Sequence, residues 1–145
     1  MNNTSLALAA EEVTQLLRRA FSDTPGDQLP VVTQAEPGRV HVVRTYGPGM
    51  MRPGGVISGP TLMGLADTAA YALILAHQGE VLMAVTSSLV MNFLRGAQPG
   101  DIHAEATFLR MGRRICVCDV RIWTETPERI AAQATVTYAM PGPPA

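Results

Sequence analysis

Hydrophobic positions along the chain follow a helical period near its start. Apolar residues recur there on one stripe, and charged residues occupy the other faces; the stripe consists of Leu6, Val13, Leu16, Leu17 and Ala20. This spacing is typical of an amphipathic helix, which we expect over residues 5–22. A segment rich in Ser, Asp, Pro and Gly at 22–27 predicts the loop that ends it.

A second, longer helix is predicted where the polar positions almost disappear. Gly59 is permissive for its cap, and Pro60 suits its first helical position because the missing N–H would lack a partner there anyway. Gly79 predicts its end. Small residues recur along it: Gly64, Ala66, Ala69, Ala70 and Ala72. Because small side chains allow close approach on most faces, we expect a sheet to wrap around this helix.

Strand-like runs occupy most of the remaining chain. One short run, 39–46, precedes the long helix, and four follow it, at 82–94, 101–110, 114–124 and 129–140. Turn residues separate the last four runs, which favours hairpins and an antiparallel meander. Alternation is partial, as expected for a sheet with its core on one side. The order of elements predicts a single α+β domain over residues 1–145.

Composition narrows the class of protein. The chain has 145 residues, no Lys and a net charge of −1, with no basic run. This excludes a basic nucleic-acid groove and a basic membrane-binding surface. Hydrophobic residues make up 47% of the chain, a high share for a small soluble monomer, so we expect it to form oligomers.

The first residues, the cysteines and the histidines bear on localisation and metal binding. The first five residues lack a basic region, which argues against a secretory signal, and we expect a cytoplasmic protein. Cys116 and Cys118 would share one strand face and are interpreted as buried apolar residues. The three histidines, His41, His77 and His103, have no spacing typical of a metal site, so we expect no metal.

The candidate chemistry begins with Asp67, the only formal charge between Arg52 and Glu80. Removing a carboxylate from water costs several kcal/mol unless it is paired or hydrogen-bonded. Proteins often keep such groups at functional sites. Taken from the residues alone, a structural hydrogen bond or a solvent-facing position explains Asp67 equally well.

Three segments carry a resemblance to a known family. Residues 54–69, 85–94 and 112–114 resemble, in order and spacing, the hotdog-fold thioesterases, in particular the PaaI-like and 4-hydroxybenzoyl-CoA thioesterase group. The resemblance covers about 38–140 and leaves out the leading helix. It implies a curved antiparallel sheet wrapped around a long central helix, and homodimers or homotetramers with active sites at the dimer interface. It further implies hydrolysis of acyl-CoA without a metal or cofactor, coenzyme A being part of the substrate.

The resemblance also implies roles for individual residues. Asp67 matches the catalytic carboxylate, acting as general base or nucleophile. Gly59 matches the residue whose backbone N–H polarises the thioester carbonyl. Thr86 matches a hydroxyl residue that places the attacking water and is contributed by the partner subunit. Ser58 stands where many relatives have His, and it joins these three as a candidate catalytic position.

Further residues are candidates for substrate binding. Arg52 could pair with Asp67 or bind phosphates, and Tyr71 could line an acyl pocket or belong to the core. Strand alternation predicts that Ser88 shares the face of Thr86. Three arginines flank one predicted turn: Arg110, Arg113 and Arg114. Guanidinium groups suit the phosphates of coenzyme A, but these residues are equally well explained as solvated turn residues.

Three functions remain open at this point. The first is an acyl-CoA thioesterase. The second is a non-catalytic acyl or acyl-CoA binding protein of the same fold. The third is a dehydratase, which would need an Asp–His pair, and no His lies near Asp67 in the sequence. The acyl chain and the choice between coenzyme A and acyl-carrier protein are left open.

Overall fold

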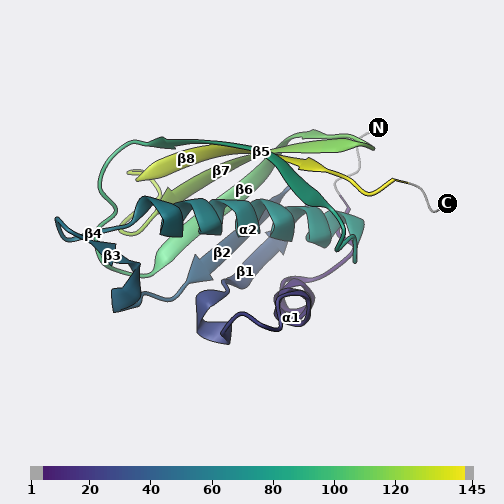
Figure 1. The fold of residues 1–145 in the computed structure, drawn as a ribbon. Coiled ribbons are helices and arrows are strands. Elements are labelled where there is room, and N and C mark those ends of the chain that lie inside the picture. Colours follow the sequence, from purple (N-terminus) through teal and green to yellow (C-terminus); the bar gives the residue numbers. More distant parts are fainter. Residues whose placement is uncertain (1–4, 143–145) are drawn as a thin grey trace.

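A curved sheet of six strands wraps around one long helix, α2 (Gly59–Gln78), in the computed structural model, which describes residues 5–142 (Figure 1). The strand order is β1-β2-β6-β7-β8-β5, and every neighbouring pair is antiparallel. The strands are β1 (Val31–Glu36), β2 (Arg39–Arg44), β5 (Val85–Phe93), β6 (Ile102–Met111), β7 (Ile115–Trp123) and β8 (Ala132–Ala139). This architecture confirms the predicted α+β hotdog fold.

Helix α2 begins one residue earlier than predicted, because Ser58 and not Gly59 is its N-cap, and it ends before Gly79 as predicted. The Ser58 hydroxyl accepts a hydrogen bond from the Thr61 N–H at 3.4 Å and caps the first turn. Gly79 ends the helix with φ of 83°, a conformation that favours glycine. The helix is long and apolar enough to cross a membrane, but 61% of its most apolar stretch is buried inside the protein. It is therefore placed as a core helix.

The first helix is shorter than predicted. Helix α1 spans Ala10–Ala20 rather than 5–22. The N–H groups of Ala7 and Leu8 donate to the carbonyl of Ala76, near the end of α2, at 2.7 and 3.0 Å. Because these two residues are held against α2, the helix starts only after Ala9. It packs beside β1 and beneath the C-terminal half of α2 (Figure 1).

Two predictions about the strands are wrong. No strand was predicted before residue 39, but β1 occupies Val31–Glu36 and pairs with β2. Strands β6, β7 and β8 do form a meander, whereas β5 pairs with β8 and not with β6. The segment after β5 is thus a crossover instead of a hairpin. Two short strands, β3 (Met51–Arg52) and β4 (Val56–Ile57), pair separately just before α2, and single 3-10 turns lie at Gly26–Gln28 and Pro48–Met50.

A bulge in β5 decides which side chains face α2. The pairing register is Thr86 with Tyr138 and then Ser88 with Thr137, so Ser87 is the extra residue. Tyr138 is buried on the inner face, whereas Thr137 lies on the outer face. Ser88 therefore lies opposite to Thr86, and the prediction that the two share a face is wrong.

Candidate active site

The carboxylate of Asp67 is held by two hydroxyl groups near the middle of α2. The Thr86 hydroxyl donates to Oδ1 at 2.6 Å, and the Tyr138 hydroxyl donates to the same atom at 2.8 Å. The Tyr138 hydroxyl also lies 3.2 Å from the backbone oxygen of Asp67. Among residues 5–142, no donor reaches Oδ2. One carboxylate oxygen is thus fixed, and the other is left to act as an acceptor.

The sheet positions both donors. Thr86 and Tyr138 are directly paired residues of β5 and β8, and their side chains point toward α2. Thr86 and Asp67 belong to the same chain, whereas the resemblance implied that Thr86 serves a partner subunit. The contact arises because the chain turns back after α2, so that β5 begins alongside the helix (Figure 1).

Tyr138 is a site residue that the sequence analysis missed. It follows Ala132, Ala134 and Val136 on the apolar face of β8. The hydroxyl of a buried Tyr usually forms a hydrogen bond with a partner. This tendency is the feature of the sequence that could have identified Tyr138. Burial raises the pKa of the Tyr138 phenol; the Thr86 hydroxyl opposes this rise, and the nearby Asp67 adds to it. The hydroxyl therefore stays protonated and remains a donor.

A cavity of about 340 Å³ opens beside this cluster. Its walls come from α1, α2, the segment before β5, β5 and β8: Ala20, Phe21, Asp67, Tyr71, Leu82, Ala84, Val85, Thr86 and Tyr138. Tyr71 was expected either to belong to the core or to line a pocket; it is buried, and it also lines the cavity. Its hydroxyl donates to the Leu82 carbonyl at 2.9 Å, which fixes the ring. Apart from Asp67, the lining carries no formal charge, which suits an apolar group next to a carboxylate.

A larger groove, about 490 Å³, lies at the other end of β5 and β8. Arg95 and Arg129 flank it together with Glu125. It contains none of the groups that contact Asp67. Its volume exceeds that of the cavity beside Asp67, but only the smaller cavity contains the Asp67 carboxylate and its two hydroxyl donors, and we place the candidate site there.

Gly59 and Ser58 lie at the start of α2, away from that cavity. Among the described residues, the Gly59 N–H donates no hydrogen bond, as expected for the first residue of a helix. Ser58 is engaged in capping, and its hydroxyl also lies 2.8 Å from that of Thr61. At a rise of 1.5 Å per residue, Gly59 and Asp67 are about 12 Å apart along the axis. Within one chain, the Gly59 N–H and the Asp67 carboxylate are therefore too far apart to contact the same substrate atom.

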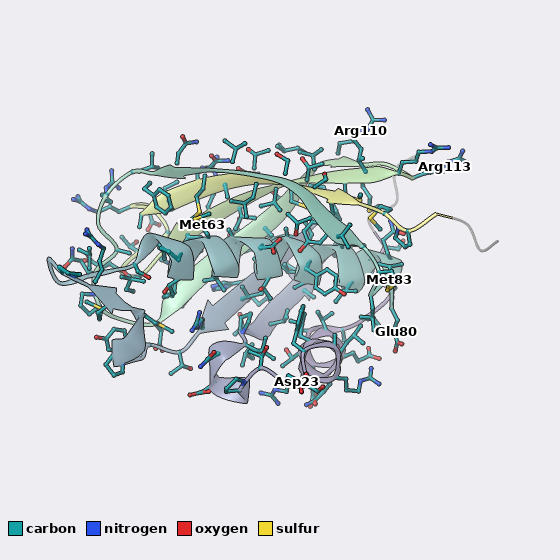
Figure 2. All side chains as sticks on the ribbon, viewed as in Figure 1. Asp23, Met63, Glu80, Met83, Arg110 and Arg113 are labelled. Carbon is teal, nitrogen blue, oxygen red and sulfur yellow. The ribbon has the colours of Figure 1, made fainter. Side chains whose placement is uncertain are left out.

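The substrate-binding candidates are dispersed. Arg52 is exposed on β3, and no ion pair recorded within residues 5–142 joins it to Asp67. Ser88 is exposed on the outer face of β5. Arg110 and Arg113 project away from α2 at the turn between β6 and β7 (Figure 2). Arg114 follows in that turn, next to Ile115. Ile115 and Val85, the first residues of β7 and β5, both pair with Ala139 of β8. The arginines therefore lie at the end of the sheet where β5 begins.

A curved sheet around a helix that carries one anchored carboxylate defines a hotdog-type protein with a candidate hydrolytic site. The sequence profile of the thioesterase superfamily matches residues 54–131, just over half of the chain. The chain therefore belongs to the thioesterase superfamily, and the predicted resemblance is confirmed. The matched range includes Gly59, Asp67 and Thr86 but not Phe21 or Tyr138. No curated protein matches the chain.

Solved structures share the fold over most of the chain. A candidate thioesterase from Silicibacter sp. TM1040 is 29% identical, with a TM-score of 0.85, and the match covers 97% of this chain and 96% of that one. Zebra fish thioesterase superfamily member 2 is 21% identical, with a TM-score of 0.79, over 93% of this chain and 100% of its own. A mutant of the phenylacetic acid degradation protein PaaI from Thermus thermophilus is 23% identical, with a TM-score of 0.68, over 79% of this chain and 95% of its own. The last two likenesses show the fold, and family membership supports thioester hydrolysis as the general activity.

Proposed function

We propose that this protein is an acyl-CoA thioesterase in which Asp67 drives hydrolysis. The observation that carries the proposal is the Asp67 carboxylate, with Oδ1 held by two hydroxyl donors and Oδ2 left free beside an apolar cavity. Two hydrogen bonds to one oxygen fix the orientation of the carboxylate. As general base or as nucleophile, Oδ2 is the oxygen that acts.

Thioester hydrolysis also needs a donor for the oxyanion, which we assign to the Gly59 N–H. An unpaired N–H at the positive end of a helix stabilises developing negative charge. Since Gly59 and Asp67 of one chain are about 12 Å apart along α2, we propose that the Gly59 of a second copy completes each site. A homodimer, alone or within a homotetramer, supplies that copy.

The exposed edge of β5 supports this assembly. Strand β5 pairs with β8 on one side only, so its other edge offers unpaired backbone groups. Large apolar side chains are exposed along and just after it, with Val90 at 59% and Phe93 at 52%. A second copy that pairs there in antiparallel fashion would cover this surface and bring the start of one α2 toward the middle of the other.

Coenzyme A would be part of the substrate, and no other cofactor is proposed. Arg113 and Arg114 lie at the end of the sheet where β5 and the cavity begin. Guanidinium groups bind phosphates through paired N–H donors. We propose that they receive the phosphates of coenzyme A while the acyl group enters the cavity beside Asp67.

Hydrolysis and simple binding are separated by one experiment. Purified protein is mixed with a panel of acyl-CoAs, and release of free thiol is followed alongside ligand-induced thermal stabilisation. A thioesterase releases thiol with multiple turnovers. Stabilisation by acyl-CoA without any thiol release would instead show a non-catalytic acyl-CoA binding protein and would overturn the proposal.

A further inference from the structure

We propose that Phe21, at the end of α1, sets the upper limit on the length of the acyl chain that this site accepts. This inference rests on the proposed function, because it concerns the substrate of the same cavity. It assigns to the N-terminal helix, which lies outside the matched residues 54–131, a role in choosing the substrate.

Three aromatic rings lead away from the carboxylate in a row. Tyr138 contacts Asp67 directly through its hydroxyl. The ring of Tyr71 is stacked on that of Tyr138, with centroids 5.7 Å apart and an angle of 17°. The ring of Phe21 then meets Tyr71 edge-on, with centroids 5.9 Å apart and an angle of 68°. Phe21 is therefore the last ring of this row, and it meets its neighbour edge-on instead of stacked.

The same cavity connects both ends of this row. Asp67 and Phe21 line it together, and Leu82, Ala84 and Val85 supply apolar surface between α2 and the start of β5. An acyl chain whose thioester lies at Asp67 can extend along Tyr138 and Tyr71 until it reaches Phe21. Each methylene buried on the way is worth about a fourfold gain in binding, and a chain that would continue past Phe21 meets its ring.

Phe21 is held in place by its backbone and by its neighbours. Its N–H donates to the Leu17 carbonyl at 2.9 Å, and Leu17 is fully buried. Its side chain is 40% exposed, so the ring forms an outer wall instead of part of the core. A smaller side chain at this position would open the end of the cavity without removing a core residue.

The test compares Phe21→Ala and Phe21→Trp with the wild-type enzyme across straight-chain acyl-CoAs, from butanoyl-CoA to tetradecanoyl-CoA. The readout is kcat/KM for each chain length. We expect the optimum to move to longer chains by two or more carbons in Phe21→Ala, with about a tenfold rise in the ratio of long-chain to short-chain kcat/KM. Phe21→Trp, which enlarges the wall, is expected to move the optimum to shorter chains.

Leu109→Ala is the matched control, because Leu109 is an exposed hydrophobic residue (63%) on β6 that does not line the cavity. It should keep the wild-type profile. Unchanged profiles in both Phe21 variants would overturn the inference while leaving the thioesterase proposal intact. If the wild type releases no thiol at all, the proposed function fails, and thermal stabilisation by the same acyl-CoAs then tests the role of Phe21. A limit on the stabilising chain length that Phe21→Ala extends supports the inference. An unchanged limit refutes it.

Discussion

At the scale of single residues, the proposed chemistry depends on how the two oxygens of Asp67 differ. Oδ1 accepts from the hydroxyls of Thr86 and Tyr138, which come from adjacent strands and cannot move independently of the sheet. We propose that Oδ2, which no donor among residues 5–142 reaches, is the oxygen that meets the water or the thioester. Preorganised donors of this kind usually contribute more to catalysis than an isolated group would.

Tyr138→Phe tests the role of the second donor. The substitution keeps the ring that stacks on Tyr71 but removes the hydroxyl that orients Asp67. Hydrogen bonds to charged groups are worth about 1.5–3 kcal/mol, so we expect kcat to fall about tenfold or more while KM changes little. Steady-state kinetics with one acyl-CoA measure both. Tyr46→Phe, on a half-exposed ring outside the cavity, is the control, and an equal loss there would remove the special role of Tyr138.

The residues of the site were predictable to different degrees. Asp67 stands out because it is the one charge in an apolar segment, and Gly59 follows from the helix start. Tyr138 and Phe21 do not, since each reaches the site through a long-range contact that local periodicity does not contain. Ser58 was marked for chemistry, but its hydroxyl serves as a helix cap.

At the scale of elements, one bulge in β5 determines which hydroxyls face the helix. A regular strand would place Thr86 and Ser88 on the same face. The extra residue, Ser87, donates through its hydroxyl to the Thr137 carbonyl at 3.3 Å and turns Ser88 outward. Bulges leave little trace in the sequence, and this explains why alternation alone assigned Ser88 to the site.

A pair of valine substitutions tests the bulge. Thr86→Val removes the donor to Asp67 while keeping the side-chain shape, and we expect about a tenfold or larger loss of kcat. Thr86→Ser restores a hydroxyl and should recover most of the rate. Ser88→Val should leave kcat unchanged because its side chain faces away from α2. A comparable loss in Ser88→Val would mean that the two residues act on the same side of the strand.

The remaining differences between expectation and structure also come from pairings distant in sequence. The limits of helix α2 follow to within one residue from Pro60 and Gly79, which belong to the segment itself. The shorter α1 follows from hydrogen bonds to Ala76, and the position of β5 follows from its pairing with β8. Local patterns predicted that these elements exist, whereas the contacts that set their limits and neighbours are not local.

At the scale of the whole molecule, a histidine pair on the outer face of the sheet links stability to pH. His41 Nε2 and His103 Nδ1 are 3.0 Å apart, and the His103 ring stacks on Trp123. Burial lowers the pKa of His41 below its ordinary value of 6.5, and His103 and then Arg39 lower it further, while Glu105 opposes them. The unfolded chain therefore takes up this proton before the folded one does as the pH falls.

We expect the free energy of unfolding to be larger above pH 6.5 and to decrease as the pH falls through and below this value. Denaturant unfolding at a series of pH values measures it. His41→Gln removes the titrating group and should flatten this part of the profile. A variant that keeps the full pH dependence would assign it to other groups.

Assembly is tested at the same scale through the two edges of the sheet. Val90→Arg places a charge on the exposed face of β5. We expect the mass measured by light scattering to decrease as the oligomer dissociates. Hydrolysis should then be lost, because Gly59 of the second copy no longer completes the site. Val31→Arg, on the opposite edge strand β1, is the control and should alter neither. A wild-type protein that is monomeric and fully active would contradict a shared site.

The most direct measurement is the rate of thiol release by Asp67→Asn against the wild type, with the same acyl-CoA and with folding checked by thermal unfolding. The asparagine keeps the size of the side chain and can still accept from Thr86 and Tyr138 through its amide oxygen, but it cannot take a proton from water or attack as a carboxylate. We expect hydrolysis to fall by about a hundredfold or more in a folded protein. A folded Asp67→Asn variant that hydrolyses at the wild-type rate would show that Asp67 does not drive the reaction.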